Sequence, residues 1–182
     1  MIIEKTFIND LVVINPTVFE DSRGYFFEAY NKAKFNENGI TFDFIQDNQS
    51  FSKRGVIRGL HLQINPCAQA KLVRVLQGEI LDVAVDLRKN SSTYGQHFSV
   101  ILNAENKKQL MVPHGFAHGF SVLSETASVM YKVDQKYHQE SERGIRYDDP
   151  TLAIDWQLNP SEVIVSEKDL ILPGFDAIDW EF

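Results

Sequence analysis

One histidine stands in an otherwise apolar run, Val56-Ile57-Arg58-Gly59-Leu60-His61-Leu62-Gln63. An imidazole titrates close to neutral pH, so His61 is a candidate general base. The run has the composition of a β-strand, in which side chains alternate between two faces. We therefore expect one face to carry Ile57, Gly59, His61 and Gln63, and the other to carry Arg58, Leu60 and Leu62. A lone histidine is more often hydrogen-bonded inside a core, so a catalytic role needs support from other residues.

A second polar stretch begins at Lys71, the first residue of Lys71-Leu72-Val73-Arg74-Val75. Farther along, strand alternation places Asp82 and Asp86 on one face of Leu81–Leu87 and four aliphatic side chains on the other. An ammonium group beside a reacting carbonyl stabilises the negative charge that develops on its oxygen. The ordinary alternative is the water-facing side of a sheet, and for Asp86 taken alone we favour that alternative.

A third stretch is Pro113-His114-Gly115-Phe116-Ala117-His118-Gly119-Phe120. Its two glycines lie four residues apart, and we expect a tight turn that presents His118. Tyr131 and Tyr137 follow. Taken alone, Tyr131 is typical of a core aromatic residue with a hydrogen-bonded hydroxyl group. Beside a base and a cation it becomes a candidate proton donor.

Two histidines raise the question of a metal site. Cupin-type sites use His-x-His, a later glutamate and a later histidine, but here Gln63 occupies the second position and Lys71 lies near the place of the acid. An amide is a weak ligand for zinc or iron, and a lysine cation repels a divalent ion. Because His61 and His118 alone are too few ligands, we expect no tightly bound metal.

The elements that must position these residues are mostly short strands. Residues 1–19 predict two strands separated by turns, and 31–38 predict a helix that Asn31 caps and Gly39 ends. Further strands are expected at 72–87 (two strands joined at Gly78), 98–102, 109–112, 119–123 and 127–133. Short helical pieces are possible near Ser161 and Ser166. This pattern favours an all-β, cupin-type jelly roll, an antiparallel sandwich or barrel with a few short peripheral helices.

Bulk properties narrow the function. With 182 residues the chain is expected to form one domain, 1–182. The net charge of −7 argues against a nucleic-acid or membrane partner, although it permits a local basic pocket. The single cysteine, Cys67, fits a reducing cytosol, and we interpret it as a passive loop residue. Neither a membrane span nor a signal peptide is predicted, so we expect a cytoplasmic protein.

In their order and spacing these motifs resemble those of the dTDP-4-dehydrorhamnose 3,5-epimerases, a metal-free cupin family. The resemblance covers nearly the whole chain, and further motifs that carry it are Phe19-Glu20-Asp21-Ser22-Arg23-Gly24, Gln46-Asp47-Asn48 and Ser166-Glu167-Lys168-Asp169. It implies a homodimeric jelly roll that needs no cofactor and acts on a nucleotide-linked 4-keto-6-deoxyhexose. The implied reaction inverts C3 and C5 of dTDP-4-dehydro-6-deoxy-D-glucose, giving dTDP-4-dehydro-L-rhamnose for dTDP-L-rhamnose biosynthesis.

The resemblance also implies roles for individual residues. His61 is the base, Asp169 orients it, Lys71 stabilises the enolate, and Tyr131 returns the proton from the opposite face of the sugar. Tyr137 stacks on the thymine ring. The other implied substrate contacts are Arg23, Glu28, Gln46, Asn48, Arg58, His118, Glu142 and Lys168. Protons at C3 and C5 both lie beside the C4 ketone, so a base, an oxyanion stabiliser and an opposed acid are the groups that the reaction needs.

Three other functions stay open from the sequence. One is a related enzyme on the same scaffold, either an epimerase acting at only C3 or only C5 or a ketoisomerase. A second is a non-catalytic cupin that binds sugar nucleotides. Retention of His61, Lys71, Tyr131 and Asp169 together argues against it, because binding alone needs no acid and base on opposed faces. The third is a metal-dependent cupin.

Overall fold

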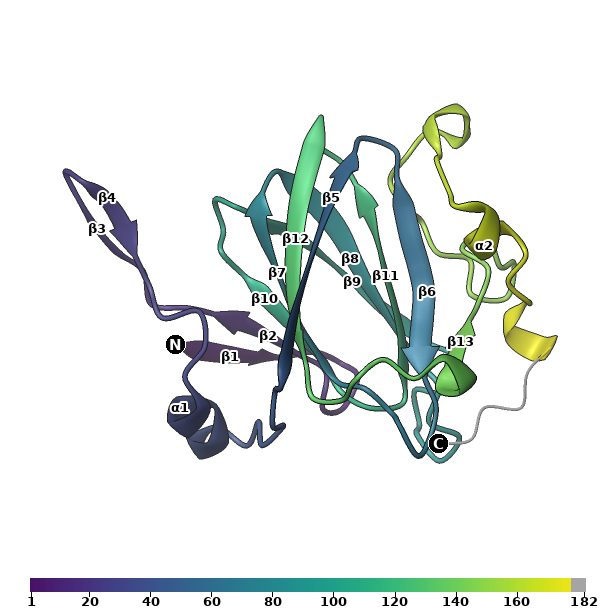
Figure 1. The fold of residues 1–182 in the computed structure, drawn as a ribbon, viewed down its shortest axis with the longest axis horizontal. Coiled ribbons are helices and arrows are strands. Elements are labelled where there is room, and N and C mark those ends of the chain that lie inside the picture. Colours follow the sequence, from purple (N-terminus) through teal and green to yellow (C-terminus); the bar gives the residue numbers. More distant parts are fainter. Residues whose placement is uncertain (178–182) are drawn as a thin grey trace.

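Two antiparallel β-sheets form the body of the computed structural model, which describes residues 1–177 (Figure 1). Within these residues, one sheet has the strand order β1 (Ile2–Lys5), β2 (Val12–Asn15), β10 (Gln109–Val112), β7 (Lys71–Gln77), β12 (Thr126–Val133) and β5 (Gln46–Lys53). The other has the order β13 (Glu142–Gly144), β6 (Ile57–Gln63), β11 (Phe116–Val122), β8 (Glu79–Asp86) and β9 (His97–Asn103). A separate hairpin, β3 (Phe19–Asp21) and β4 (Gly24–Phe26), projects away from both sheets. The predicted all-β jelly roll is thereby confirmed.

The main core lies between the two sheets, and a second core covers the outer face of the five-stranded sheet. Ile80 and Ala84 of β8 point into the first, whereas Leu81 and Val83 point into the second, as the predicted alternation requires. The second core is completed by apolar residues of the C-terminal segment, among them Trp156. Both faces of β8 are therefore buried, and Asp82 lies on the inner one between the sheets.

The alternation predicted for β6 is wrong at one step. Ile57 packs in the same core cluster as Leu60 and Leu62, while Arg58 and His61 line one cavity. The cause is a β-bulge: His118 of β11 pairs with His61 and Phe120 pairs with Arg58, so two residues of β6 oppose Gly119. A side chain on either glycine at this point would collide, since an ideal Cβ on Gly59 lies 2.5 Å from the Gly119 Cα.

Two further expectations are corrected. Asp86 does not face water: its side chain is fully buried and accepts hydrogen bonds from Arg88, Ser91 and Thr93. Those three residues follow on the next loop, which folds back over the end of β8. His118 is not presented by a tight turn either. The turn lies at 114–115, and His118 occupies the middle of β11, so a strand fixes its side chain.

Short helices occur at the predicted positions near Asn31 and Ser166. In α1 (Lys32–Glu37) the Asn31 side chain accepts from the Lys34 N–H, and in α2 (Glu167–Leu170) the Ser166 side chain accepts from the Asp169 N–H. The 3₁₀ turns are η1 (Gln139–Ser141), η2 (Pro160–Glu162) and η3 (Phe175–Ala177). Figure 1 shows α2 beside β6, which brings Asp169 next to the histidine strand. Within 1–177 no helix has the length and apolar character needed to cross a bilayer.

Candidate active site

A cavity of about 510 Å³ lies between the two sheets, with α2 at its edge. Strands β5, β7 and β12 contribute residues from the six-stranded sheet, and β6 and β11 contribute from the other. Seven of the residues predicted for the site line it: Arg58, His61, Lys71, His118, Tyr131, Lys168 and Asp169. These seven residues lie up to 111 positions apart in the chain, and strands of both sheets together with helix α2 bring them to one cavity.

His61 and Asp169 form a hydrogen-bonded pair, with His61 Nε2 2.7 Å from Asp169 Oδ1. The His61 side chain is 33% exposed and that of Asp169 is almost fully buried. Burial raises the pKa of the Asp169 carboxyl, but bonds from His61, the Gly59 N–H and Ser166 outweigh it, so the pKa lies below its ordinary value. An ionised Asp169 favours a proton on Nε2, which makes Nδ1 the nitrogen able to accept one.

Lys71 is a buried cation of the cavity. Its side chain is buried, and Nζ donates to the backbone carbonyl oxygen of His61 at 3.1 Å. Burial lowers the pKa of Lys71 to about 8, against the opposing charges of Asp82 and Glu142. At neutral pH the amine is therefore still mostly protonated and can donate to a developing oxyanion.

A second histidine–carboxylate pair lies beside the first. His118 Nε2 is 2.8 Å from Asp82 Oδ1, both side chains are buried, and His118 is the register partner of His61. Asp82 Oδ2 has no hydrogen-bond partner among the described residues. Sequence reasoning noted Asp82 but gave it no role. The available signal was an acid in the middle of a strand whose neighbouring residues, Ile80 to Val85, are otherwise all apolar.

Tyr131 faces the same cavity from the opposite sheet. It belongs to β12, whereas His61 belongs to β6, so the phenol and the imidazole approach the space from two different walls. Burial raises the pKa of Tyr131, and the nearby charge of Arg58 only partly opposes this. The phenol therefore holds its proton at neutral pH and is a donor rather than a base.

Strand β5 presents a row of polar side chains inward. Gln46, Asn48, Ser50 and Ser52 alternate with more exposed residues, and Ser50 lines the cavity. Asn48 is the register partner of Tyr131 and accepts a hydrogen bond from Gln46 Nε2 at 2.8 Å. Ser52 Oγ accepts from Arg58 Nε at 3.0 Å, which orients that guanidinium. Gln46 and Asn48 do not line the cavity themselves but continue the strand face that does.

Tyr137, Glu142 and Lys168 form a cluster at the rim. The Tyr137 hydroxyl donates to Glu142 Oε2 at 2.9 Å, and Lys168 Nζ donates to the same oxygen at 2.8 Å. Burial alone raises the pKa of Glu142, but these two bonds outweigh it and hold the pKa below its ordinary value. Since Lys168 lines the cavity, the cluster continues its wall outward.

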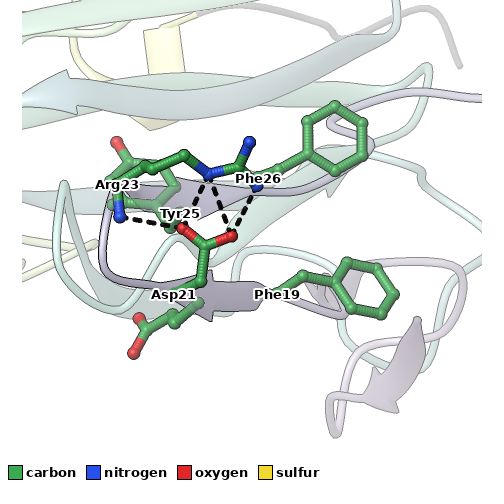
Figure 2. A pocket seen from close by; sticks show the side chains of 7 residues that line it. Phe19, Asp21, Arg23, Tyr25 and Phe26 are labelled. Carbon is green, nitrogen blue, oxygen red and sulfur yellow. Dashed lines mark hydrogen bonds and ion pairs between the residues drawn. The ribbon is translucent and has the colours of Figure 1, made fainter.

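Arg23 and Glu28 do not line this cavity in a single copy of the chain. Figure 2 shows Arg23 at the tip of the β3–β4 hairpin, where its guanidinium pairs with Asp21 at 2.6 Å. Glu28 pairs instead with Lys34 and accepts from Asn31. In Figure 1 the hairpin lies at the opposite side of the molecule from α2. The family resemblance implies that both residues contact the substrate, and one copy of the chain does not assemble them with His61.

Comparisons with known proteins place this geometry in context. A family model described as dTDP-4-dehydrorhamnose 3,5-epimerase matches residues 5–177. The dTDP-4-dehydrorhamnose 3,5-epimerase of Methanothermobacter thermautotrophicus is 52% identical over 166 residues, 91% of this chain and 89% of that protein.

Solved structures agree. The enzyme of the same name from Elizabethkingia anophelis has a TM-score of 0.93 at 53% identity and covers 97% of each chain. A dTDP-6-deoxy-D-glucose 3,5-epimerase of Legionella pneumophila, in complex with dTDP-4-keto-L-rhamnose, has a TM-score of 0.93 at 49% identity, covering 97% of this chain and 94% of that one.

Proposed function

Because the chain belongs to the dTDP-4-dehydrorhamnose 3,5-epimerase family, we propose that it inverts C3 and C5 of dTDP-4-dehydro-6-deoxy-D-glucose, giving dTDP-4-dehydro-L-rhamnose. The observation that carries this function is a single cavity with a histidine base on one wall, a phenol on the other, and a buried ammonium group in the same space. In its family the activity serves the synthesis of dTDP-L-rhamnose, and we place the protein in the cytoplasm.

The first step removes a proton from carbon next to the C4 ketone. His61 Nδ1 accepts this proton, and Asp169, bonded to Nε2 at 2.7 Å, stabilises the imidazolium that forms. Asp169 is itself fixed by the Ser166 cap and the Gly59 N–H, so the ring is oriented before the sugar arrives. General-base assistance of this kind contributes about 10²–10⁴ in rate.

The enolate oxygen is stabilised by Lys71. Its ammonium group is buried, and a charge in such surroundings interacts more strongly with a new negative charge than it would in water. Its bond to the His61 carbonyl fixes Nζ relative to the strand that carries the base. Base and cation are thus held in one rigid frame.

Inversion requires that the new proton arrive from the other face of the ring, and Tyr131 supplies it. Each inverted centre leaves His61 with one extra proton and Tyr131 with one fewer. Before the second centre reacts, His61 must lose its extra proton and Tyr131 must regain one. The partly exposed His61 side chain provides contact with water for this exchange. Solvent protons therefore end up at the inverted carbons.

Substrate binding is assigned to the rest of the cavity. Arg58 and Lys168 are the cations available for the diphosphate, and Tyr137 is the exposed ring for the thymine base. His118, Gln46 and Asn48 contact the sugar or nucleoside from the two sheets. Glu142 acts by holding Tyr137 and Lys168 together.

The remaining predicted contacts, Arg23 and Glu28, fit a homodimer. The hairpin that carries Arg23 exposes Phe19 and Phe26, each by more than 60% of its surface. Exposed aromatic side chains on a projecting hairpin are typical of a surface that another molecule covers. A second copy of the chain would cover it and bring Arg23 toward a cavity that its own chain does not reach.

The experiment that tests this function is NMR of the 4-keto-6-deoxyglucose nucleotide incubated with the protein in heavy water. Two deuterium atoms per product, at C3 and C5, together with inverted coupling patterns at both carbons, are expected. One deuterium would indicate a single-centre epimerase, and a shifted ketone would indicate a ketoisomerase. Elemental analysis of the same sample tests the expectation that turnover needs no metal.

A further inference from the structure

Gln63 is the polar residue of the stretch Val56–Gln63 to which the proposed mechanism gives no role. It ends β6, its side chain is buried, and its amide makes three hydrogen bonds with backbone groups. Nε2 donates to the carbonyl oxygens of Cys67 at 2.7 Å and Lys136 at 3.1 Å. Oε1 accepts from the His138 N–H at 2.7 Å. One amide therefore grips the residue before Tyr137 and the residue after it.

The Tyr137 ring is restrained although it is exposed. Its surface is 60% accessible, yet its hydroxyl donates to Glu142 Oε2. Glu142 is the register partner of Gln63 in the pairing of β13 with β6. The backbone around Tyr137 and the tip of its ring are thus both fixed by a single pair of facing residues. An aromatic ring held in this way needs no packing on its open faces and loses little entropy when a planar group stacks on it.

An amide suits this position for a chemical reason. The two carbonyls and the N–H that surround Gln63 require two donors and one acceptor from the same buried side chain, and only an amide supplies both kinds in that geometry. A carboxylate would face two carbonyl oxygens without a proton to donate, and an aliphatic side chain would leave two carbonyls and one N–H of this partly buried site without their partner.

We propose that Gln63 is a positioning residue for nucleotide recognition, which fixes Tyr137 as a flat platform for the pyrimidine ring of the substrate. This inference rests on the proposed function, because it takes the nucleotide end of the substrate to lie against Tyr137. Gln63 touches no reacting atom. It acts on affinity for the nucleotide and leaves the proton-transfer steps to His61, Lys71 and Tyr131.

The test is calorimetric binding of dTDP to the full-length protein. Loss of base stacking weakens binding by about tenfold or more, and we expect this for Tyr137→Ala, for Gln63→Leu and for Gln63→Glu. The double variant Gln63→Leu/Tyr137→Ala should bind dTDP no more weakly than Tyr137→Ala alone, because Gln63 then has no ring left to position. We call the three hydrogen bonds of Gln63 to the backbone the clamp. With saturating substrate, kcat of the Gln63 variants should stay within about threefold of the wild type, so that the loss is confined to KM.

Gln69→Leu is the matched control. Gln69 Nε2 also donates to a carbonyl of the same segment, that of Gln135 at 2.6 Å, but this bond is exposed to solvent and Gln135 does not flank Tyr137. The dTDP affinity of Gln69→Leu should remain within about twofold of the wild type, because the exposed carbonyl of Gln135 can bond to water instead.

Two results overturn the proposal: additive losses in the double variant, or a fall in kcat with unchanged dTDP affinity in Gln63→Leu. Should the Gln63 variants not fold, hydrogen exchange of the wild-type protein decides. The His138 amide must be protected before dTDP is added, and exchange at the unstructured rate excludes the clamp. Because dTDP binding is measured without turnover, failure of the epimerase function would show in the heavy-water experiment and not here.

Discussion

Two histidine–carboxylate pairs lie at the cavity, and they match in chemistry but differ in access to water. His61 Nε2 is 2.7 Å from Asp169 Oδ1, and His118 Nε2 is 2.8 Å from Asp82 Oδ1. The two histidines lie on neighbouring strands, β6 and β11. The His61 imidazole is 33% exposed and its carboxylate comes from a surface helix, whereas both members of the second pair come from adjacent strands and are buried. Hydrogen-bond geometry alone therefore does not show which of the two histidines is the catalytic base.

Exposure is what separates their functions. A base that turns over must pass its proton to water and recover, which the partly exposed His61 can do. The His118 imidazole is buried and bonded to a buried carboxylate, so it has little access to water and serves better as a fixed hydrogen-bonding group. We therefore assign proton transfer to His61 and a fixed contact with the substrate to His118.

Replacing the base gives the largest expected effect. His61→Asn should lower kcat by at least about 10³, because the asparagine side chain preserves much of the shape but accepts no proton at neutral pH. Binding of dTDP should stay within about twofold of the wild type, as measured by calorimetry. Activity within tenfold of the wild type would transfer the base role to another group.

Removing the charge of each carboxylate compares the two pairs directly. Asp169→Asn should lower kcat by about 10², because the tautomer and the imidazolium of His61 lose their support. Asp82→Asn should lower kcat by only about tenfold, while costing about 1–3 kcal/mol of unfolding free energy, because one end of a buried hydrogen bond is altered. Steady-state kinetics and urea unfolding measure both. Equal losses of kcat would contradict the division of labour between the pairs.

The smallest effect is a shift in pH dependence. Lys71 stabilises the enolate only when protonated, so kcat/KM should fall as the pH rises through the pKa of about 8. The charge of Asp82 raises the pKa of Lys71, as does that of Glu142, and Asp82→Asn should therefore move this alkaline limb to lower pH. A limb that stays in place in Asp82→Asn would mean that Lys71 does not control it.

Local signals in the sequence predicted most of the fold. The turn at Gly78 separates β7 from β8, and Asn31 and Ser166 cap the helices that follow them, because these features depend on neighbouring residues alone. Which side chains of β6 face the cavity depends on the pairing of β6 with its partner strand, β11. The bulge opposite Gly119 places Arg58 and His61 in one cavity, and no period-two pattern predicts such a step.

The site residues likewise divide into those that the sequence could predict and those whose placement depends on distant elements. Residues that face inward from a strand, such as His61, Lys71 and Tyr131, were accessible to sequence reasoning together with the family resemblance. Asp82 and Asp86 were not, since their burial is decided by partners on other elements, His118 on β11 and Arg88 on the following loop. Arg23 lies outside the cavity because it belongs to a hairpin that projects away from both sheets.

The central claim is that His61 and Tyr131 act on opposite faces of one sugar, and Tyr131→Phe in heavy water tests it most directly. Phenylalanine keeps the ring and removes the hydroxyl group to which we assign return of the proton. We predict that the variant exchanges substrate protons for deuterium through His61 while inverted product forms at least about 10² more slowly than in the wild type. Inversion at the wild-type rate in Tyr131→Phe would contradict the claim, because the second proton would then come from another group.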